Sequence, residues 1–211
     1  MIGRPVVDCT PIGRLERKTS VLQIPVDVKL STRFSTVYKQ LAGIMARNPQ
    51  ARKIGVIGLP PHIRKLREVL GESPLGARIL KTCYFGEGLD RASNSWHTQC
   101  DLLVVLGTPR VPQEAVIDEL IRRGRHKEAL EDGKWETLRW EAETSEGARR
   151  IVDGLWYANL SWRQVHIGLV RAPMIQAIGR ARSFQDDGIP VIVCSNEPLG
   201  FTGGERISAD A

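Results

Sequence analysis

The chain has 211 residues, which is enough for one large domain with a single core. We do not expect a second domain. Lys and Arg number 30 against 24 Asp and Glu, which gives a formal net charge of +6. That balance favours a polyanionic partner such as nucleic acid, although a solvated basic surface explains the composition equally well. No long apolar run or secretory leader is present, so we expect a cytoplasmic protein without a membrane partner.

The four cysteines give little support for a metal site. Cys9, Cys83, Cys100 and Cys194 form no C-x-x-C pair, and the last three adjoin apolar runs. Buried, reduced thiols are the simplest interpretation. His97 and Cys100 have the spacing of a metal-binding pair, but no second pair follows at a suitable distance, so we expect no metal ligands.

The first 50 residues predict lead-in strands and one helix. Residues 21–28 alternate between apolar and polar side chains, as in a strand. Residues 34–47 place Val37, Leu41, Ile44 and Met45 on one face of a helix, which ends before Pro49.

Short apolar runs then alternate with amphipathic segments. The aliphatic strands and the helices between them favour an α/β fold with a parallel sheet covered on both faces. Ligands of such sheets bind at the carboxyl ends of the strands. The expected strands are 54–58, 78–85, 102–106 and 189–194, and the expected helices are 63–70 and 113–123, the latter capped at Gly124.

Residues 125–165 interrupt this alternation and are interpreted as an insertion. We expect a strand over 134–141 and a helix over 148–157. Tryptophans and arginines are concentrated here, so the rings are predicted either to stack on exposed bases or to pack the insertion onto the rest of the protein. The residues are Trp135, Trp140, Trp156, Trp162, Arg149, Arg150 and Arg163.

The stretch Gln176 to Arg182 carries two arginines and leads, through Asp186-Asp187-Gly188, into the last apolar run. We expect it to form a helix that enters a buried strand. Arginine stays charged, and its planar fork gives bidentate hydrogen bonds to phosphate. We further predict that this helix shares one edge of the sheet with the loops after Ile57, Phe85 and Leu106.

A complete nucleotide-hydrolysing site is not predicted. The sequence contains no G-x-x-x-x-G-K-[ST] motif to hold nucleotide phosphates. The apolar run 102–106 also lacks a closing acidic residue that would hold magnesium, because Asp101 stands at its start.

Gln176-x-x-Gly179-Arg180-x-Arg182 resembles motif VI of the superfamily 2 helicases. Residues 88–94, Gly-Leu-Asp-Arg-Ala-Ser-Asn, followed by 101–109, are similar to motif V, and 53–58 with the following Pro-Pro turn is similar to motif IV. The motifs stand in the family's order between about Lys53 and Ser195. The resemblance implies a RecA-like C-terminal helicase lobe occupying the whole chain as one domain, more similar to helicases of phage and plasmid replication than to the DEAD-box type.

This resemblance assigns roles to the motif VI residues. Arg180 and Arg182 would be arginine fingers that stabilise charge on the transferred phosphoryl group. Gln176 would hydrogen-bond near the nucleotide, and Gly179 would allow the helix to approach it. The alternative is that both arginines lie on the surface of an ordinary helix.

The resemblance also predicts nucleotide sensing and nucleic-acid contacts. Gly88 and Asp90 would respond to the nucleotide. Short polar side chains and cations would meet backbone phosphates, unless Asp90 and Asn94 only brace their turn. The predicted phosphate contacts are Arg91, Ser93, Asn94, Thr108, Arg110 and, at the motif IV loop, His62, for which a simple surface position is the alternative.

The predicted function is therefore one lobe of an ATP-dependent helicase or translocase. ATP and Mg would be held mainly by an N-terminal partner RecA-like lobe, either in the same longer protein or in a separate subunit. The chain alone is therefore not expected to hydrolyse ATP. Nucleic acid, with DNA favoured over RNA, is the second expected partner. The alternative is a non-catalytic module that retains the fold and binds nucleic acid or protein.

Overall fold

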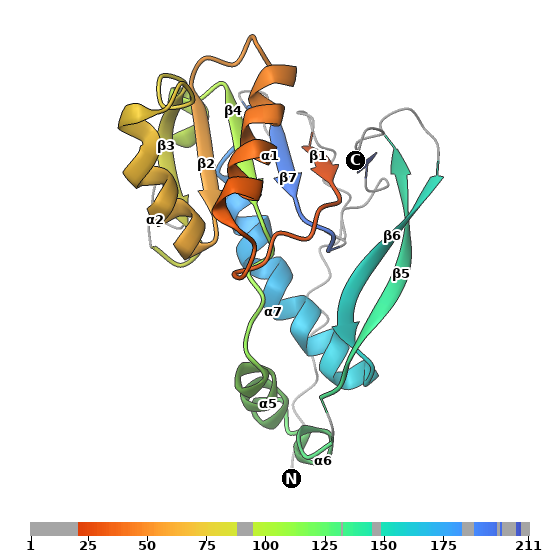
Figure 1. Cartoon of the computed structure of the whole chain (residues 1–211). Helices are drawn as coiled ribbons and strands as arrows, with labels where there is room; N and C mark the ends of the chain where they lie inside the picture. Colours follow the sequence, from red (N-terminus) through yellow and green to blue (C-terminus); the bar gives the residue numbers. More distant parts are fainter. Residues whose placement is uncertain are drawn as a thin grey trace.

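A computed structural model describes residues 21–87, 95–131, 133–144, 149–182, 188–197, 199 and 206–207. Its strands form one sheet in the order β3-β2-β4-β7-β1-β8-β5-β6 (Figure 1). The first five of these are mutually parallel: β3 (Ile79–Tyr84), β2 (Ile54–Gly58), β4 (Leu102–Leu106), β7 (Val191–Cys194) and β1 (Val21–Ile24). The predicted α/β class with a parallel sheet is confirmed, and the sheet is consistent with a RecA-like lobe.

Helices cover both faces of this sheet. On one face, α1 (Phe34–Arg47) and α2 (Pro60–Val69) bury Leu41, Ile44 and Ile63 against the strands. On the other face, the second half of α7 (Leu160–Gly179) packs with Trp96 of α4 (Trp96–Gln99). The strands between are buried on both sides, which explains why β2 and β4 read as continuous apolar runs.

Most predicted elements form close to their expected bounds. The helix predicted over 34–47 is α1, and the helix predicted over 113–123 is α5 (Gln113–Arg122), followed by Gly124 with φ of 74°. The helix predicted through 63–70 is α2, which is continued by the short 3-10 helix η1 (Leu70–Glu72). The strand predicted over 21–28 is shorter, since β1 ends at Ile24.

The insertion contains a hairpin where one strand and one helix are predicted. Residues of β5 (Trp135–Thr144) pair antiparallel with β6 (Arg149–Tyr157). The prediction of a helix over 148–157 is therefore wrong. Along β6, Val152 and Trp156 are buried while Ile151 and Asp153 are exposed, which is the alternation of a strand.

The hairpin continues the sheet beyond β8, and its open end, where Trp135 pairs with Tyr157, lies near α5, α6 (His126–Ala129) and the first half of α7 (Figure 1). These elements enclose a separate apolar cluster that includes Leu120, Tyr157, Trp162 and Val165. We call this part the side module, comprising α5, α6, β5, β6 and the first half of α7. The strand β8 (Arg206–Ile207) joins the hairpin to β1.

The long helix α7 links the side module to the sheet. Asn159 caps its amino end, because the side-chain oxygen accepts hydrogen bonds from the backbone N–H groups of Ser161 and Trp162. Trp162 and Val165 belong to the side-module cluster, whereas Met174 and Ile178 belong to the sheet core. Within the described ranges, no helix combines the length and the apolar character needed to span a membrane.

Candidate functional site

The predicted arginines lie at the amino edge of the sheet. Arg180 is the C-cap of α7, and the backbone N–H of Ile189 donates to the carbonyl of Ala181 at 2.9 Å, two residues before β7 begins. The loops after β2, β3 and β4 leave from the opposite, carboxyl edge. The prediction that all of them share one edge is wrong, because a crossover helix runs back along the sheet and delivers its carboxyl end to the start of the next strand.

The predicted motif VI residues nevertheless share one end of α7. Gln176 and Gly179 are exposed and lie one turn apart, while Ala177, Ile178 and Ala181 are buried in the sheet core. The buried residues hold the last turn in place and leave the side with Gln176 and Gly179 facing outward. An added Cβ at Gly179 would have no atom within 4 Å, so the fold itself does not require glycine there.

The turn after α7 has an unusual backbone. Arg182 adopts φ of 50°, a left-handed conformation that residues with a side chain rarely take. Gly188 approaches it so closely that an added Cβ would lie 2.3 Å from the Arg182 carbonyl oxygen. Arg180 and Arg182 are half-buried, and cations at the carboxyl end of a helix are favoured by its dipole.

Thr108 turns into the protein and does not face solvent. The residue is 3% exposed, and its Oγ1 lies 2.7 Å from the Oγ of Ser195 after β7. The Ser195 hydroxyl oxygen also accepts from the backbone N–H of Glu197 at 3.1 Å. A phosphate contact through this hydroxyl would require the buried pair to open, so the geometry does not support the predicted role of Thr108.

Arg110 is held by three parts of the chain. Its Nη1 donates to the carbonyl of Leu155 in β6 at 2.9 Å, and its Nη2 lies 3.1 Å from Glu197 Oε1 and 3.4 Å from Asp27 Oδ1. The guanidinium therefore joins the β1–α1 loop, the end of β7 and the hairpin. Its predicted phosphate contact is not supported, because both terminal nitrogens are already engaged with oxygens of the protein.

Glu197 is a buried carboxylate that the sequence does not identify as a site residue. It is 2% exposed, and burial raises its pKa, although Arg110 and a hydrogen bond from the Trp156 indole act in the opposite direction. Gln23 adds a further link, because its Nε2 donates to the carbonyls of Ser195 and Glu197 at 2.6 and 2.9 Å. The position of an acidic residue just after the apolar β7 is the one sequence signal that could have indicated it.

The tryptophans of the insertion pack and hydrogen-bond within the protein. Trp140 Nε1 donates to the carbonyl of Asn196 at 3.0 Å, and Trp162 Nε1 donates to the carbonyl of Glu128 at 2.7 Å. The Trp135 ring stacks on Tyr157 with centroids 4.0 Å apart. Of the two roles considered for these rings, the structure supports packing of the insertion rather than stacking on bases.

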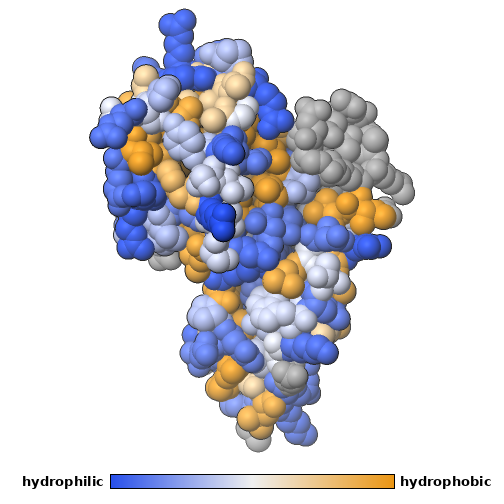
Figure 2. Space-filling view, viewed as in Figure 1, coloured by the Kyte–Doolittle hydropathy of each residue, from blue (hydrophilic) through white to orange (hydrophobic). Residues whose placement is uncertain are grey.

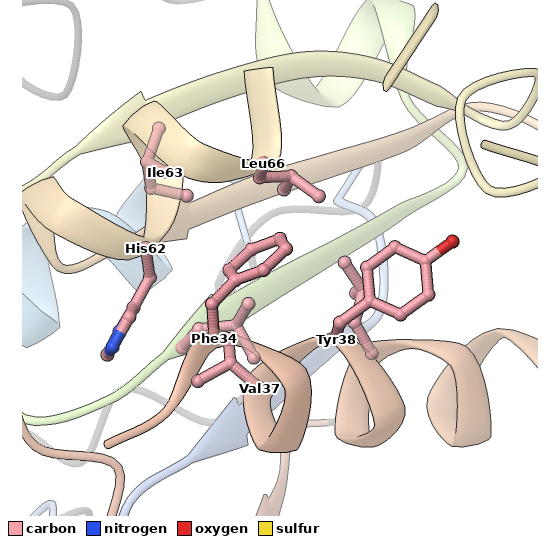
Figure 3. A pocket seen from close by; sticks show the side chains of 8 residues that line it. Phe34, Val37, Tyr38, His62, Ile63 and Leu66 are labelled. Carbon is pink, nitrogen blue, oxygen red and sulfur yellow. The ribbon is translucent and has the colours of Figure 1, made fainter. Parts of the chain in front are cut away.

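His62 is also an internal residue. It is 4% exposed, and its Nε2 lies 2.9 Å from the carbonyl oxygen of Thr32. Figure 3 shows the ring near the start of α2, on the side that faces α1, close to Ile63 and Phe34. Neither the predicted phosphate contact nor a surface position is supported, because the ring attaches α2 to the loop before α1.

The predicted motif V residues Gly88, Asp90, Arg91, Ser93 and Asn94 lie outside the described residues. The preceding part of that loop is well anchored. Both carboxylate oxygens of Glu87 accept from Arg67 of α2, at 2.8 and 2.9 Å, and this hydrogen bonding lowers the pKa of Glu87.

No metal-binding cluster is found in the part of the chain that the structure describes, where no three His, Cys, Asp or Glu side chains gather suitably. Cys83, Cys100 and Cys194 are buried, as predicted, and form no disulfide among the described residues. Burial raises the pKa of the Cys100 thiol to about 11 and that of Cys194 to about 12, which leaves both protonated at neutral pH.

Comparisons of the chain with family models, with curated proteins and with solved structures find no match. The resemblance to helicases therefore depends on the motifs themselves, and on how well the parallel sheet and the end of α7 suit them.

Proposed function

We propose that this chain is the C-terminal lobe of a cytoplasmic, ATP-dependent nucleic-acid helicase or translocase. The observation that carries this proposal is the geometry at the end of α7. Gln176 and Gly179 face outward on its last turn, and Arg180 and Arg182 follow where the chain turns into the sheet. In this proposal, that end of α7 faces a nucleotide bound by a partner RecA-like lobe.

The end of α7 suits arginine fingers because its backbone is held from within the lobe. Ala177, Ile178 and Ala181 have at most 1% of their surface exposed, and the turn closes against Gly188. Rigidly placed cations stabilise a transition state without first having to be reorganised. The backbone that carries both arginines would then move with the lobe as a whole, so closure of the two lobes would bring them to the phosphates.

The chemistry assigned to the pair of lobes is hydrolysis of ATP. Water attacks the γ-phosphorus, the bond to the bridging oxygen breaks, and ADP leaves with the electron pair. Arg180 and Arg182 would stabilise the negative charge on the transferred group, while the partner lobe would bind ATP and Mg. This chain has no P-loop motif of its own, so we expect no hydrolysis by the chain alone.

The proposal is tested by measuring nucleic-acid-stimulated ATP hydrolysis in the presence of the partner lobe. We expect Arg180→Ala and Arg182→Ala to lower kcat by about 100-fold or more, as loss of a positioned donor or arginine finger does in other enzymes. The affinity for ATP, which the partner lobe would supply, should change much less.

Arg64→Ala is the matched control, because Arg64 is an exposed arginine of α2 on the opposite face of the sheet from α7. Parental rates in both the Arg180→Ala and Arg182→Ala proteins would contradict the arginine-finger assignment. That result, combined with retained nucleic-acid binding, would favour the non-catalytic binding module instead.

A further inference from the structure

Cations that do not pair within the described residues are found on the outer side of α1. Lys39 and Arg47 are exposed, and within the described part of the chain neither forms an ion pair. The sequence of α1 contains no acidic residue that could neutralise them. Arg110, by contrast, is engaged with Glu197 and Asp27, so it does not supply a comparable open positive charge.

A shallow hollow lies between these two cations. Lys39 and Arg47 flank it, and Gln40 and Gly43 form its base, with a volume of about 340 Å³. An added Cβ at Gly43 would meet no atom within 4 Å, so the glycine leaves space that the fold does not use. Glycine inside a helix costs about 1 kcal/mol relative to alanine. Gly43 therefore destabilises α1, and packing within the protein does not explain why a glycine is present there.

A more apolar groove adjoins the hollow and shares Lys39 with it. The Phe34 and Tyr38 rings line this groove beside Val69 and Pro74, and it measures about 450 Å³. The two ring centroids are 5.9 Å apart, and Figure 3 shows both rings on the side of α1 that faces α2. Figure 2 shows apolar side chains among the hydrophilic ones that cover this face of the molecule.

The polar groups at the groove also suit a nucleobase. Glu72 lies on its far wall and can accept hydrogen bonds from a base amino group, as carboxylates do with cytosine. The Tyr38 hydroxyl is bonded to Ser73 Oγ, which holds the ring in its place along the groove.

We infer that single-stranded nucleic acid binds along α1, with a base in the groove at Phe34 and Tyr38 and phosphates at Lys39 and Arg47. A surface that joins aromatic rings to a row of cations is the usual form of a non-specific single-strand site. Lys39 and Arg47 are about 12 Å apart along the helix axis, a span of several backbone phosphates. The inference depends on the proposed function only for the class of ligand, and it assigns a surface outside the helicase-like motifs.

An acidic peptide would explain the cations, and an apolar helix would explain the rings. Neither alone explains both features at adjoining sites that share one lysine. Phosphate contacts of this kind position a strand without reading its sequence, so we expect binding that depends on salt and little on base composition.

The test is fluorescence anisotropy of a labelled single-stranded oligonucleotide of about 12 nucleotides, within the ~4–16-nucleotide range of single-strand sites. We expect the full chain carrying Lys39→Gln and Arg47→Gln to bind at least about 10-fold more weakly, with a shallower dependence on salt concentration. Gly43→Leu should also weaken binding, because it fills the hollow. Its thermal stability should not fall, since leucine is the better helix former.

Two matched controls have the same chemistry elsewhere. Lys127→Gln with Lys134→Gln removes two exposed lysines, one in α6 and one just before β5, and Gly168→Leu fills an open glycine position of α7. Both control proteins should bind like the parent. Equal weakening in test and control proteins, or parental binding after the α1 changes, would overturn the inference. Either result would leave the ATPase test of Arg180 and Arg182 unaffected.

Discussion

The Trp156 indole Nε1 donates a 2.6 Å hydrogen bond to Glu197 Oε2, joining the open end of the hairpin to a buried carboxylate just after β7. The other carboxylate oxygen lies 3.1 Å from Arg110 Nη2. One acidic residue thus connects the side module to the parallel sheet, through a donor from β6 and a cation from the loop after β4.

Loss of the Trp156 indole donor, which bonds to a carboxylate, should destabilise the protein more than loss of the Trp140 indole donor, which bonds to a neutral carbonyl. We expect Trp156→Phe to lower the free energy of unfolding by about 1.5–3 kcal/mol, because a buried charged acceptor loses its partner. Trp140→Phe removes a bond to the neutral Asn196 carbonyl and should cost about 0.5–1.5 kcal/mol. Urea unfolding of both proteins measures the difference, and equal losses would contradict it.

Removing Arg110 should be more damaging than removing it together with the Glu197 charge. Arg110→Met leaves a buried carboxylate without its cation, which costs about 3–5 kcal/mol in comparable proteins. Adding Glu197→Gln removes that charge and keeps an oxygen that can accept from Trp156, so the double variant should recover part of the loss. Fully additive losses in urea unfolding would show that the two side chains do not interact.

Gly107 should be harder to replace than Gly124, although both have positive φ. The φ of Gly107 is 89°, and an added Cβ would lie 2.9 Å from the Val28 carbonyl oxygen. Gly124 has φ of 74° and open space around it. We expect Gly124→Ala to cost about 1–2 kcal/mol through backbone strain alone, and Gly107→Ala to cost more, as thermal unfolding would report. The reverse order would contradict the close approach of the β1–α1 loop.

Stability should fall as the pH falls from about 6.5 to about 4 because of His166. Burial, with a smaller contribution from Arg110, lowers the pKa of this residue from 6.5 to about 4. Between these two pH values the unfolded chain binds a proton that the folded protein excludes. This difference lowers the free energy of unfolding by about 3 kcal/mol once the pH is below 4. His166→Phe should flatten this part of the stability profile measured by urea unfolding.

The raised pKa of Glu197 acts in the opposite direction, because the folded protein takes up that proton more readily as the pH falls. The difference between parent and variant isolates His166 from this contribution. His126→Gln, which removes an exposed histidine, is the matched control variant. An identical slope in the parent and the His166→Phe protein would contradict the assignment.

Gly179→Ala separates a role in the fold from a role at the proposed nucleotide site. An alanine Cβ would have free space within the lobe, so stability should be unchanged or higher by up to about 1 kcal/mol. If α7 approaches a nucleotide there, ATP hydrolysis with the partner lobe should drop. Gly168→Ala, three turns earlier on the same helix, should leave the rate at its parental value. Unchanged hydrolysis in both proteins would contradict a close approach at Gly179.

The predictable part of the fold is the part with strong local patterns. The helix from Phe34 to Arg47 was readable because one face is apolar and Pro49 follows its end. The strand β6 could not be predicted from its local pattern, because its apolar residues also match the spacing of an amphipathic helix. These residues are Ile151, Val152, Leu155 and Trp156. Pairing with β5 settles its structure, and that pairing is a long-range contact that no local window contains.

The candidate site was predictable in its residue types but not in its surroundings. The sequence shows that Thr108 and Arg110 follow an apolar strand, yet their partners Ser195 and Glu197 come 87 residues after each of them. The edge of the sheet at which Arg180 emerges depends likewise on the path of α7. The roles predicted for Gly88 to Asn94 stay predictions, because these residues lie outside the described part of the chain.

The position of β1 has a consequence for the order of folding. This strand lies between β7 and β8, and Val21 pairs with Val191 (Figure 1). During synthesis it must wait for almost the whole described chain to emerge before either neighbour exists. The pairs of β2 with β3 and β4 involve much shorter loops, whose closure costs less entropy. We therefore expect the sheet to start from β2, β3 and β4, with β1 held by α1 and its apolar side chains until β7 arrives.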